Sequence, residues 1–74
     1  MTVQQIQEIS FLRDSVRYTI HVERNADGVM WGTWHCHDCR SGGSANKSST
    51  DVPKAVEAAR ESLEVHHQMY HATV

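Results

Sequence analysis

One segment of the chain carries a β-forming residue at every second position, and this alternation limits most strongly how the chain can fold. The β-forming residues are Val16, Tyr18, Ile20 and Val22. Polar residues stand between them, a pattern typical of a strand with one buried face. Asp27-Gly28 follows, and this pair favours a tight turn because both residue types accept positive φ. With a second strand over residues 29–37, the sequence predicts an antiparallel hairpin.

A helical repeat occupies the C-terminal third of the chain. Asp51 is a good helix N-cap, and Pro53 follows in the first turn, where its missing N–H costs nothing. The residues that recur every three or four positions are Val52, Val56, Ala59, Leu63, His66 and Tyr70. This spacing predicts a helix over residues 51–71 that packs one stripe of side chains on the sheet.

The predicted fold class is α+β: a small antiparallel β-sheet in β-β-β-α order, with one long C-terminal helix packed on one face. Residues 16–50 form the predicted β-meander, including a short third strand over residues 44–49. Residues 1–14 are ambiguous, because an edge strand and a short helix both fit them. With 74 residues, the chain is expected to be a single domain.

Composition narrows the classes of partner. Hydrophobic residues make up 39% and charged residues 22% of the chain, which is typical of a folded domain. The net charge is -2 and the seven lysines and arginines are scattered, whereas nucleic-acid binding concentrates positive charge. The chain has neither a run of roughly 20 apolar residues nor a signal-like N-terminus. We therefore expect a cytoplasmic protein that binds neither nucleic acid nor membranes.

A domain this small often depends on a metal, a disulfide or a partner subunit. In the cytoplasm, Cys36 and Cys39 are expected as thiols or metal ligands rather than as a disulfide. Two cysteines separated by two residues match half of a tetrahedral zinc site. We expect the turn to aim both thiolates at one point, and Gly42-Gly43 to let the backbone curl round them.

Histidines near the end of the predicted helix could supply the other half of the site. His67 and His71 are four residues apart and share a helix face. If the third strand is seven residues long, it covers roughly 23 Å, and the helix from residue 52 to 67 covers roughly 22 Å on its way back. Both halves should therefore arrive at the same end of the domain. We predict a structural zinc bound by Cys36, Cys39, His67 and His71.

Three other interpretations of these residues stay open. The cysteines could be small apolar core residues, with the histidines on an exposed helix end. The Cys-x-x-Cys pair could serve a thiol, redox or metal-dependent enzyme, although no helix start follows it to stabilise a thiolate. A rival metal site would join His35 and His37 to Glu8 or Asp14 on the opposite face.

The six histidines also permit a pH-responsive regulator, because their protonation would make the net charge positive. Catalytic motifs such as a Ser-His-Asp arrangement or a phosphate-binding glycine loop are absent from the sequence. We therefore expect a non-enzymatic binding or regulatory module that is stabilised by zinc.

The predicted helix covers one face of the sheet and leaves the other open. Trp31 and Trp34 are three residues apart in a strand, so regular pleating sends them to opposite faces. Trp31 should lie on the open face with Arg17 and His21. An exposed tryptophan among polar residues is typical of a contact surface. We expect a protein partner or self-association there, unless residues 3–12 fold over it.

Overall fold

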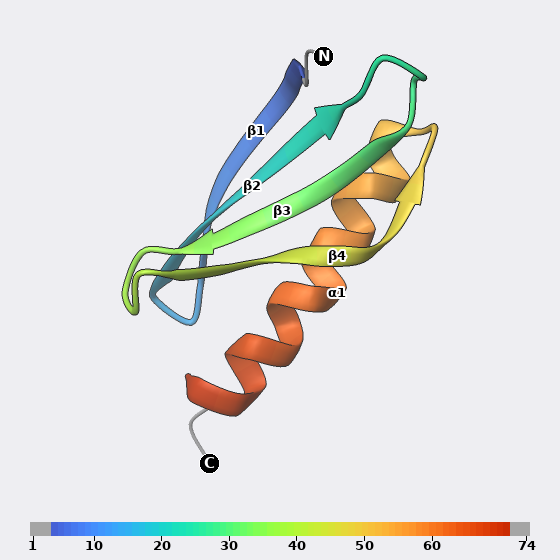
Figure 1. Cartoon of the computed structure of the whole chain (residues 1–74). Helices are drawn as coiled ribbons and strands as arrows, with labels where there is room; N and C mark the ends of the chain where they lie inside the picture. Colours follow the sequence, from blue (N-terminus) through green and yellow to red (C-terminus); the bar gives the residue numbers. More distant parts are fainter. Residues whose placement is uncertain (1–3, 72–74) are drawn as a thin grey trace.

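In the computed structural model, which describes residues 4–71, one antiparallel sheet carries one helix on a single face (Figure 1). The elements, in chain order, are β1 (Gln4–Arg13), β2 (Val16–Arg24), β3 (Met30–Cys36), β4 (Ser41–Ser49) and α1 (Val52–Tyr70). Each strand pairs with the next, in the spatial order β1-β2-β3-β4. The predicted α+β class and the long C-terminal helix are confirmed.

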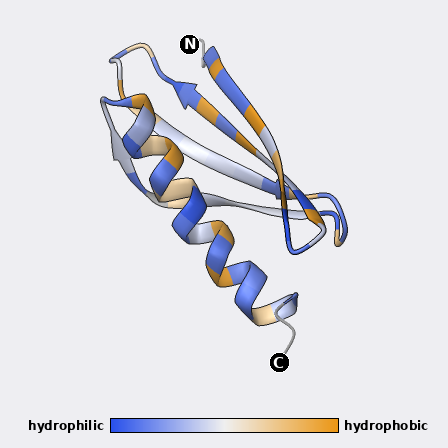
Figure 2. Cartoon of the chain, turned by 180° about the vertical axis from the view of Figure 1, so that it is seen from behind, coloured by the Kyte–Doolittle hydropathy of each residue, from blue (hydrophilic) through white to orange (hydrophobic). Residues whose placement is uncertain are grey.

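The sheet has one strand more than the predicted β-β-β-α order, because the N-terminal segment forms β1. Ile9 and Phe11 pair with Ile20 and Tyr18 of β2, and their half-buried side chains extend the apolar face of the sheet. Figure 2 shows the alternation of polar and apolar residues along both strands. From residue 4 onward, the segment therefore lies along the edge of the sheet and does not fold over the open face.

A two-residue turn at Asp14-Ser15 joins β1 to β2. Both residues have positive φ, 51° and 69°, as a type I′ hairpin turn requires. The central hairpin was predicted, and its turn occupies residues 25–29. There the side-chain carbonyl of Asn25 accepts the backbone N–H groups of Asp27 and Val29, both at 3.0 Å, while Gly28 has a φ of 83°.

Helix α1 begins after Asp51, as predicted, although the Asp51 side chain makes no capping hydrogen bond. The buried stripe of the helix keeps Ala59 and Leu63 of the predicted one, but it is completed by Ala55 and His67. A Cβ atom built on Gly32 would lie 2.6 Å from both the Ala55 carbonyl oxygen and the Ala59 Cβ. Helix and sheet therefore meet closely at Gly32, and this approach turns the alanines toward the sheet.

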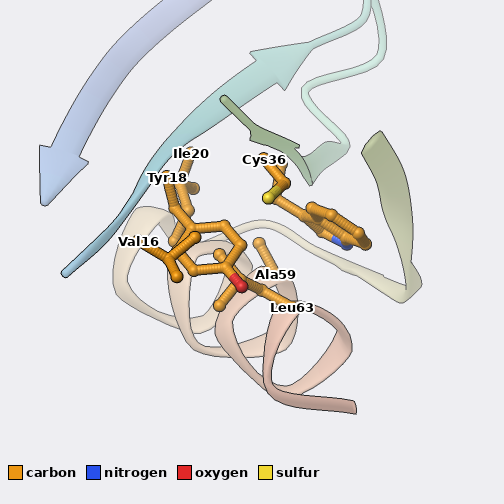
Figure 3. Packing of buried hydrophobic residues seen from close by; sticks show 7 residues of the cluster. Val16, Tyr18, Ile20, Cys36, Ala59 and Leu63 are labelled. Atoms are coloured by element: carbon orange, nitrogen blue, oxygen red, sulfur yellow. The ribbon is translucent and has the colours of Figure 1, made fainter. Parts of the chain in front are cut away.

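The core lies between β2, β3 and α1. Val16, Tyr18 and Ile20 project from β2 toward Ala59 and Leu63 of the helix (Figure 3). All five are buried, and Tyr18 is fully so. Within the described residues, no helix has the length and apolar character needed to cross a membrane.

Candidate metal centre

Two cysteines and two histidines come together at one end of the domain. They are Cys36, Cys39, His66 and His71, and their four donor atoms all lie within 4.8 Å of one another. Cys36 ends β3, Cys39 lies in the turn before β4, and the histidines come from the last residues of α1 and its C-cap. The prediction that the returning helix ends beside the end of the second meander strand is therefore confirmed.

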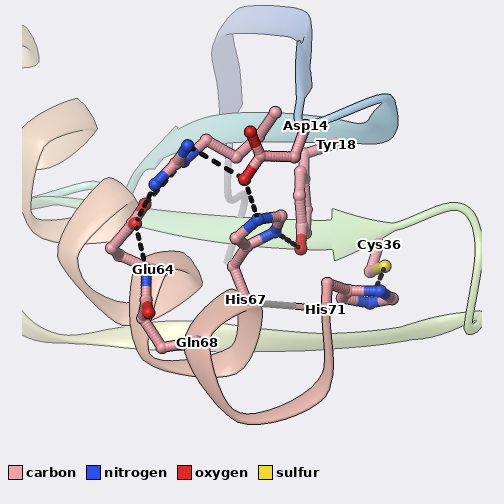
Figure 4. A network of polar contacts seen from close by, with 8 residues as sticks. Asp14, Tyr18, Cys36, Glu64, His67, Gln68 and His71 are labelled. Carbon is pink, nitrogen blue, oxygen red and sulfur yellow. Dashed lines mark hydrogen bonds and ion pairs between the residues drawn. The ribbon is translucent and has the colours of Figure 1, made fainter. Parts of the chain in front are cut away.

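The donor distances are close to those of a tetrahedral metal site. The Cys39 Sγ lies 3.1 Å from the Cys36 Sγ and 3.1 Å from the His66 Nε2. The His71 Nε2 lies 3.5 Å from each sulfur, and Figure 4 shows its contact with Cys36. Zinc–sulfur bonds of about 2.3 Å and zinc–nitrogen bonds of about 2.0–2.1 Å separate neighbouring donors by roughly 3.3–3.8 Å. The remaining pairs lie within 4.8 Å, so closing the set round a zinc ion would take shifts of up to about 1 Å.

His67, which we predicted as a ligand, lies in the core instead. Its side chain is 0% exposed, its Nδ1 lies 2.8 Å from the Tyr18 hydroxyl, and its Nε2 lies 2.9 Å from the Asp14 carboxylate (Figure 4). When the carboxylate accepts the hydrogen on Nε2, Nδ1 is available to accept the Tyr18 O–H. With both nitrogens engaged, His67 is not part of the cluster, and His66 takes its place.

The end of the helix explains how His66 and His71 meet although they are five residues apart. In a regular helix this spacing would rotate the two side chains away from each other. Helix α1 ends at Tyr70, and His71 has a non-helical φ of -125° while its N–H still donates to the His67 carbonyl at 2.8 Å. The His71 ring therefore reaches the His66 ring, with centroids 5.2 Å apart.

The glycines after the cysteines have a role different from the one we expected. The turn residue with positive φ is Arg40, at 54°. Gly42 and Gly43 lie in β4, where they leave room for Trp34: a Cβ on Gly43 would lie 2.9 Å from the indole ring. The Trp34 ring in turn packs against His66, with centroids 4.8 Å apart. The glycines therefore help to position a histidine of the cluster.

The two thiols differ in their readiness to ionise. Burial raises the pKa of Cys36 above its ordinary value. The pKa of Cys39 is lowered to about 6, first by the Ser41 hydroxyl and then by Cys36 and the neighbouring histidines. Cys39 is exposed, and at neutral pH it is largely a thiolate, the form of cysteine that binds metals.

A polar network behind the cluster fixes the helix to the first hairpin. The Arg13 guanidinium donates to both carboxylate oxygens of Glu64, at 2.7 and 3.3 Å, and to Asp14 at 3.2 Å. The bond to Arg13 holds the pKa of Glu64 at about 2. Together with the Asp14–His67–Tyr18 contacts, this network joins the β1–β2 turn to α1. Sequence reasoning missed it, because residues 51 positions apart show no local signal of pairing.

The residues predicted for a partner surface lie on the open face. Trp31 pairs with Glu23 on that face and is half-buried, whereas Trp34 is buried on the helix side, as predicted. Arg17 is exposed and His21 is half-buried. The expected protein partner or self-association stays a prediction.

Comparison of the chain with protein-family models, with curated proteins and with solved structures gives no match. What the cluster can do therefore follows from its donor atoms. Two thiolates and two imidazoles within reach of one point form a donor set that suits zinc.

Proposed function

We propose that this protein is a small, non-enzymatic binding or regulatory module whose fold is closed by a structural zinc ion at Cys36, Cys39, His66 and His71. The observation that carries the proposal is the convergence of these four donors within 4.8 Å, from two segments of the chain. Four protein ligands leave no coordination position for a reacting water, which favours a structural role over a catalytic one.

Apart from the buried contacts of His67, little holds the last turns of the helix in place. Leu63 is the last buried apolar residue of α1 in the part of the chain that the structure describes. Beyond it, Val65, Met69 and Tyr70 are largely exposed, so apolar packing holds the final turns weakly. A zinc ion bound to His66 and His71 would tie these turns to the β3–β4 turn.

The cluster is also reachable from solvent. An open hollow lined by Trp34, Ser41 and Tyr70 leads to Cys39 and both histidines of the cluster. A metal ion could therefore enter on the Cys39 side, where the thiolate forms first. Cys36, on the buried side, would lose its proton as the ion binds.

Native mass spectrometry tests the proposal. We expect one zinc ion per chain, lost after treatment with a strong chelator. At a free zinc concentration 100 times Kd, binding stabilises the folded state by about 2.7 kcal/mol. For a domain of this size the melting temperature should therefore rise by roughly 10–20 °C.

Cys39→Ser is the informative variant, because Cys39 is exposed and its replacement leaves the core packing unchanged. We expect the variant to fold, to bind no zinc tightly and to melt at the same temperature with and without chelator. A wild-type chain that takes up no zinc after reconstitution would contradict the proposal. A mass lower by two hydrogens would instead support the Cys-x-x-Cys redox alternative.

A further inference from the structure

A second group of histidines lies on the open face of the sheet, away from α1. The histidines are His21 on β2, His35 on β3 and His37 just after β3, and they lie beside Glu8 on β1 and Thr19 on β2. Thr19 pairs with His35, and His21 pairs with Glu8. The backbone N–H of His37 continues the β2–β3 pairing just past the end of β3. Three imidazoles and one carboxylate therefore share one small area of the sheet.

These side chains surround a shallow depression with a polar floor. Together with Ser10 they line it, and Thr19 at its centre is only 7% exposed. The Thr19 hydroxyl lies 3.0 Å from the Ser10 hydroxyl and 2.8 Å from the His37 Nε2. His35 and His37 are exposed at the rim. The floor is held by hydrogen bonds, and the imidazoles at the rim have room to turn.

Neighbouring groups leave ring nitrogens available for a ligand. The His21 Nδ1 lies 3.3 Å from a Glu8 carboxylate oxygen and 3.1 Å from the Gln5 side-chain carbonyl. Both oxygens are acceptors, so the hydrogen sits on Nδ1 and Nε2 keeps its lone pair. His37 uses Nε2 for Thr19, which leaves its Nδ1. Metal-binding histidines are commonly oriented by such second contacts.

The spacing along the strand favours chelation. His35 and His37 are two residues apart and share a face, and their ring centroids lie 4.9 Å apart. His21 stands diagonally across from His35, because its partner on β3 is Thr33. Side chains in diagonal positions of a sheet lie within reach of one another when they are long. Within the described residues, metal-ligand atoms already converge only at the Cys36 cluster. On the open face, the side chains would have to rotate to bring the three rings onto one ion.

We propose that His21, His35 and His37 form a second metal site, for a divalent transition-metal ion that prefers nitrogen ligands, such as Ni²⁺ or Cu²⁺. Glu8 and Thr19 act as positioning residues. The carboxylate of Glu8 at the same depression favours a cation over an anion. The site has no thiolate and shares no ligand with the Cys36 centre, so it holds its ion independently.

Titration of the zinc-loaded wild-type protein with Ni²⁺, followed by ¹H–¹⁵N NMR, tests this proposal. Ni²⁺ is the better probe, because Cu²⁺ also oxidises thiols. The paramagnetic ion broadens the signals of nearby residues, so signals from residues 19–21 and 33–37 should disappear first, while those of residues 60–70 persist. Broadening centred on His66 and His71 would overturn the proposal.

Two substitutions of exposed residues, His35→Asn and His37→Asn, sharpen the test without disturbing the core. Each should weaken Ni²⁺ binding at least about tenfold, since even the loss of an outer-shell partner has an effect of that order. Unchanged Ni²⁺ binding in the double variant would overturn the second site. The double variant should still hold one zinc ion per chain in native mass spectrometry, so a failure of the proposed zinc centre would be recognised separately.

Discussion

The His66 Nε2 lies 3.1 Å from the Cys39 Sγ, although 27 positions separate the two residues in the sequence. This contact joins the last turns of α1 to the turn after β3. The next residue, His67, points into the core and contacts Tyr18 and Asp14. Two adjacent histidines therefore have different environments, which makes them a matched pair for substitution.

We expect His66→Asn to lose tight zinc binding and His67→Asn to keep one zinc ion per chain. His67→Asn should instead have a lower free energy of unfolding than wild type in the presence of chelator. It removes a buried partner of Tyr18, and an unsatisfied buried polar group costs about 1–3 kcal/mol. Native mass spectrometry gives the stoichiometry, and urea unfolding gives the stability. Loss of zinc from the His67 variant alone would contradict the ligand set.

Tyr18→Phe should destabilise the fold by about 1–3 kcal/mol, because the buried Nδ1 of His67 loses its hydrogen-bond donor. Zinc binding should persist, since the Tyr18 hydroxyl is not one of the four donors. Tyr70→Phe is the control: Tyr70 is 69% exposed, and its substitution should change stability by no more than about 0.5 kcal/mol. Equal stabilities of the two variants in urea would show that the Tyr18–His67 bond contributes nothing.

The Arg13–Glu64 pair should contribute a small, pH-dependent stability. In the folded state the pKa of Glu64 is about 2, below its ordinary value of 4.5. Ionised Glu64 therefore stabilises the fold above roughly pH 4.5, and this contribution is lost as pH falls toward 2. The pair is partly exposed, so the effect should stay below about 1 kcal/mol.

The measurement is the difference in unfolding free energy between wild type and Glu64→Gln, both with chelator, from pH 6 to pH 2. It should be constant at the upper end and shrink below about pH 4.5. Glu61→Gln is a suitable control, because Glu61 forms no ion pair within residues 4–71. A difference that grows on acidification would contradict the assigned pairing.

Alkylation should distinguish the two cysteines in chelator-treated protein. Cys39 is exposed and its pKa is lowered to about 6, so its reaction with iodoacetamide should reach half its maximal rate near pH 6. Cys36 is buried with a raised pKa and should react only at higher pH. Mass spectrometry of peptides follows each site. Two thiols that both titrate near roughly 8.5, the value for free cysteine, would rule out the contacts assigned to Cys39.

The elements with strong local patterns could be predicted from the sequence. The alternation of apolar and polar residues over Val16–Val22 and the turn residues Asp27-Gly28 specify the central hairpin. Asp51 marks the start of the helix. In the region of strand β1 the sequence fits both a strand and a short helix, although the alternation of Ile9 and Phe11 favours the strand. The type I′ turn that completes this hairpin uses Asp and Ser, not the more recognisable Asn-Gly, so its sequence signal is weak.

The ligand set illustrates what local patterns cannot decide. The choice between His66 and His67 depends on the rotation of α1 about its own axis. That rotation is set by the approach of Ala55 and Ala59 to Gly32, a contact between elements far apart in the sequence. His71 also leaves the helical geometry, so the position of its side chain cannot be predicted from the i,i+4 spacing of a regular helix.

The tight approach at Gly32 also makes the helix a lever arm. The pivot lies near Ala55, and His66 stands eleven residues further on, roughly 16 Å along the axis at 1.5 Å per residue. Tilting the axis by about 5° at the pivot would displace His66 by roughly 1.4 Å over that length. A bulkier side chain at position 32 would therefore disturb the geometry of the cluster, because a tilt of α1 moves the end of the helix that carries His66. It would do so although position 32 is remote from every sulfur and imidazole of the cluster.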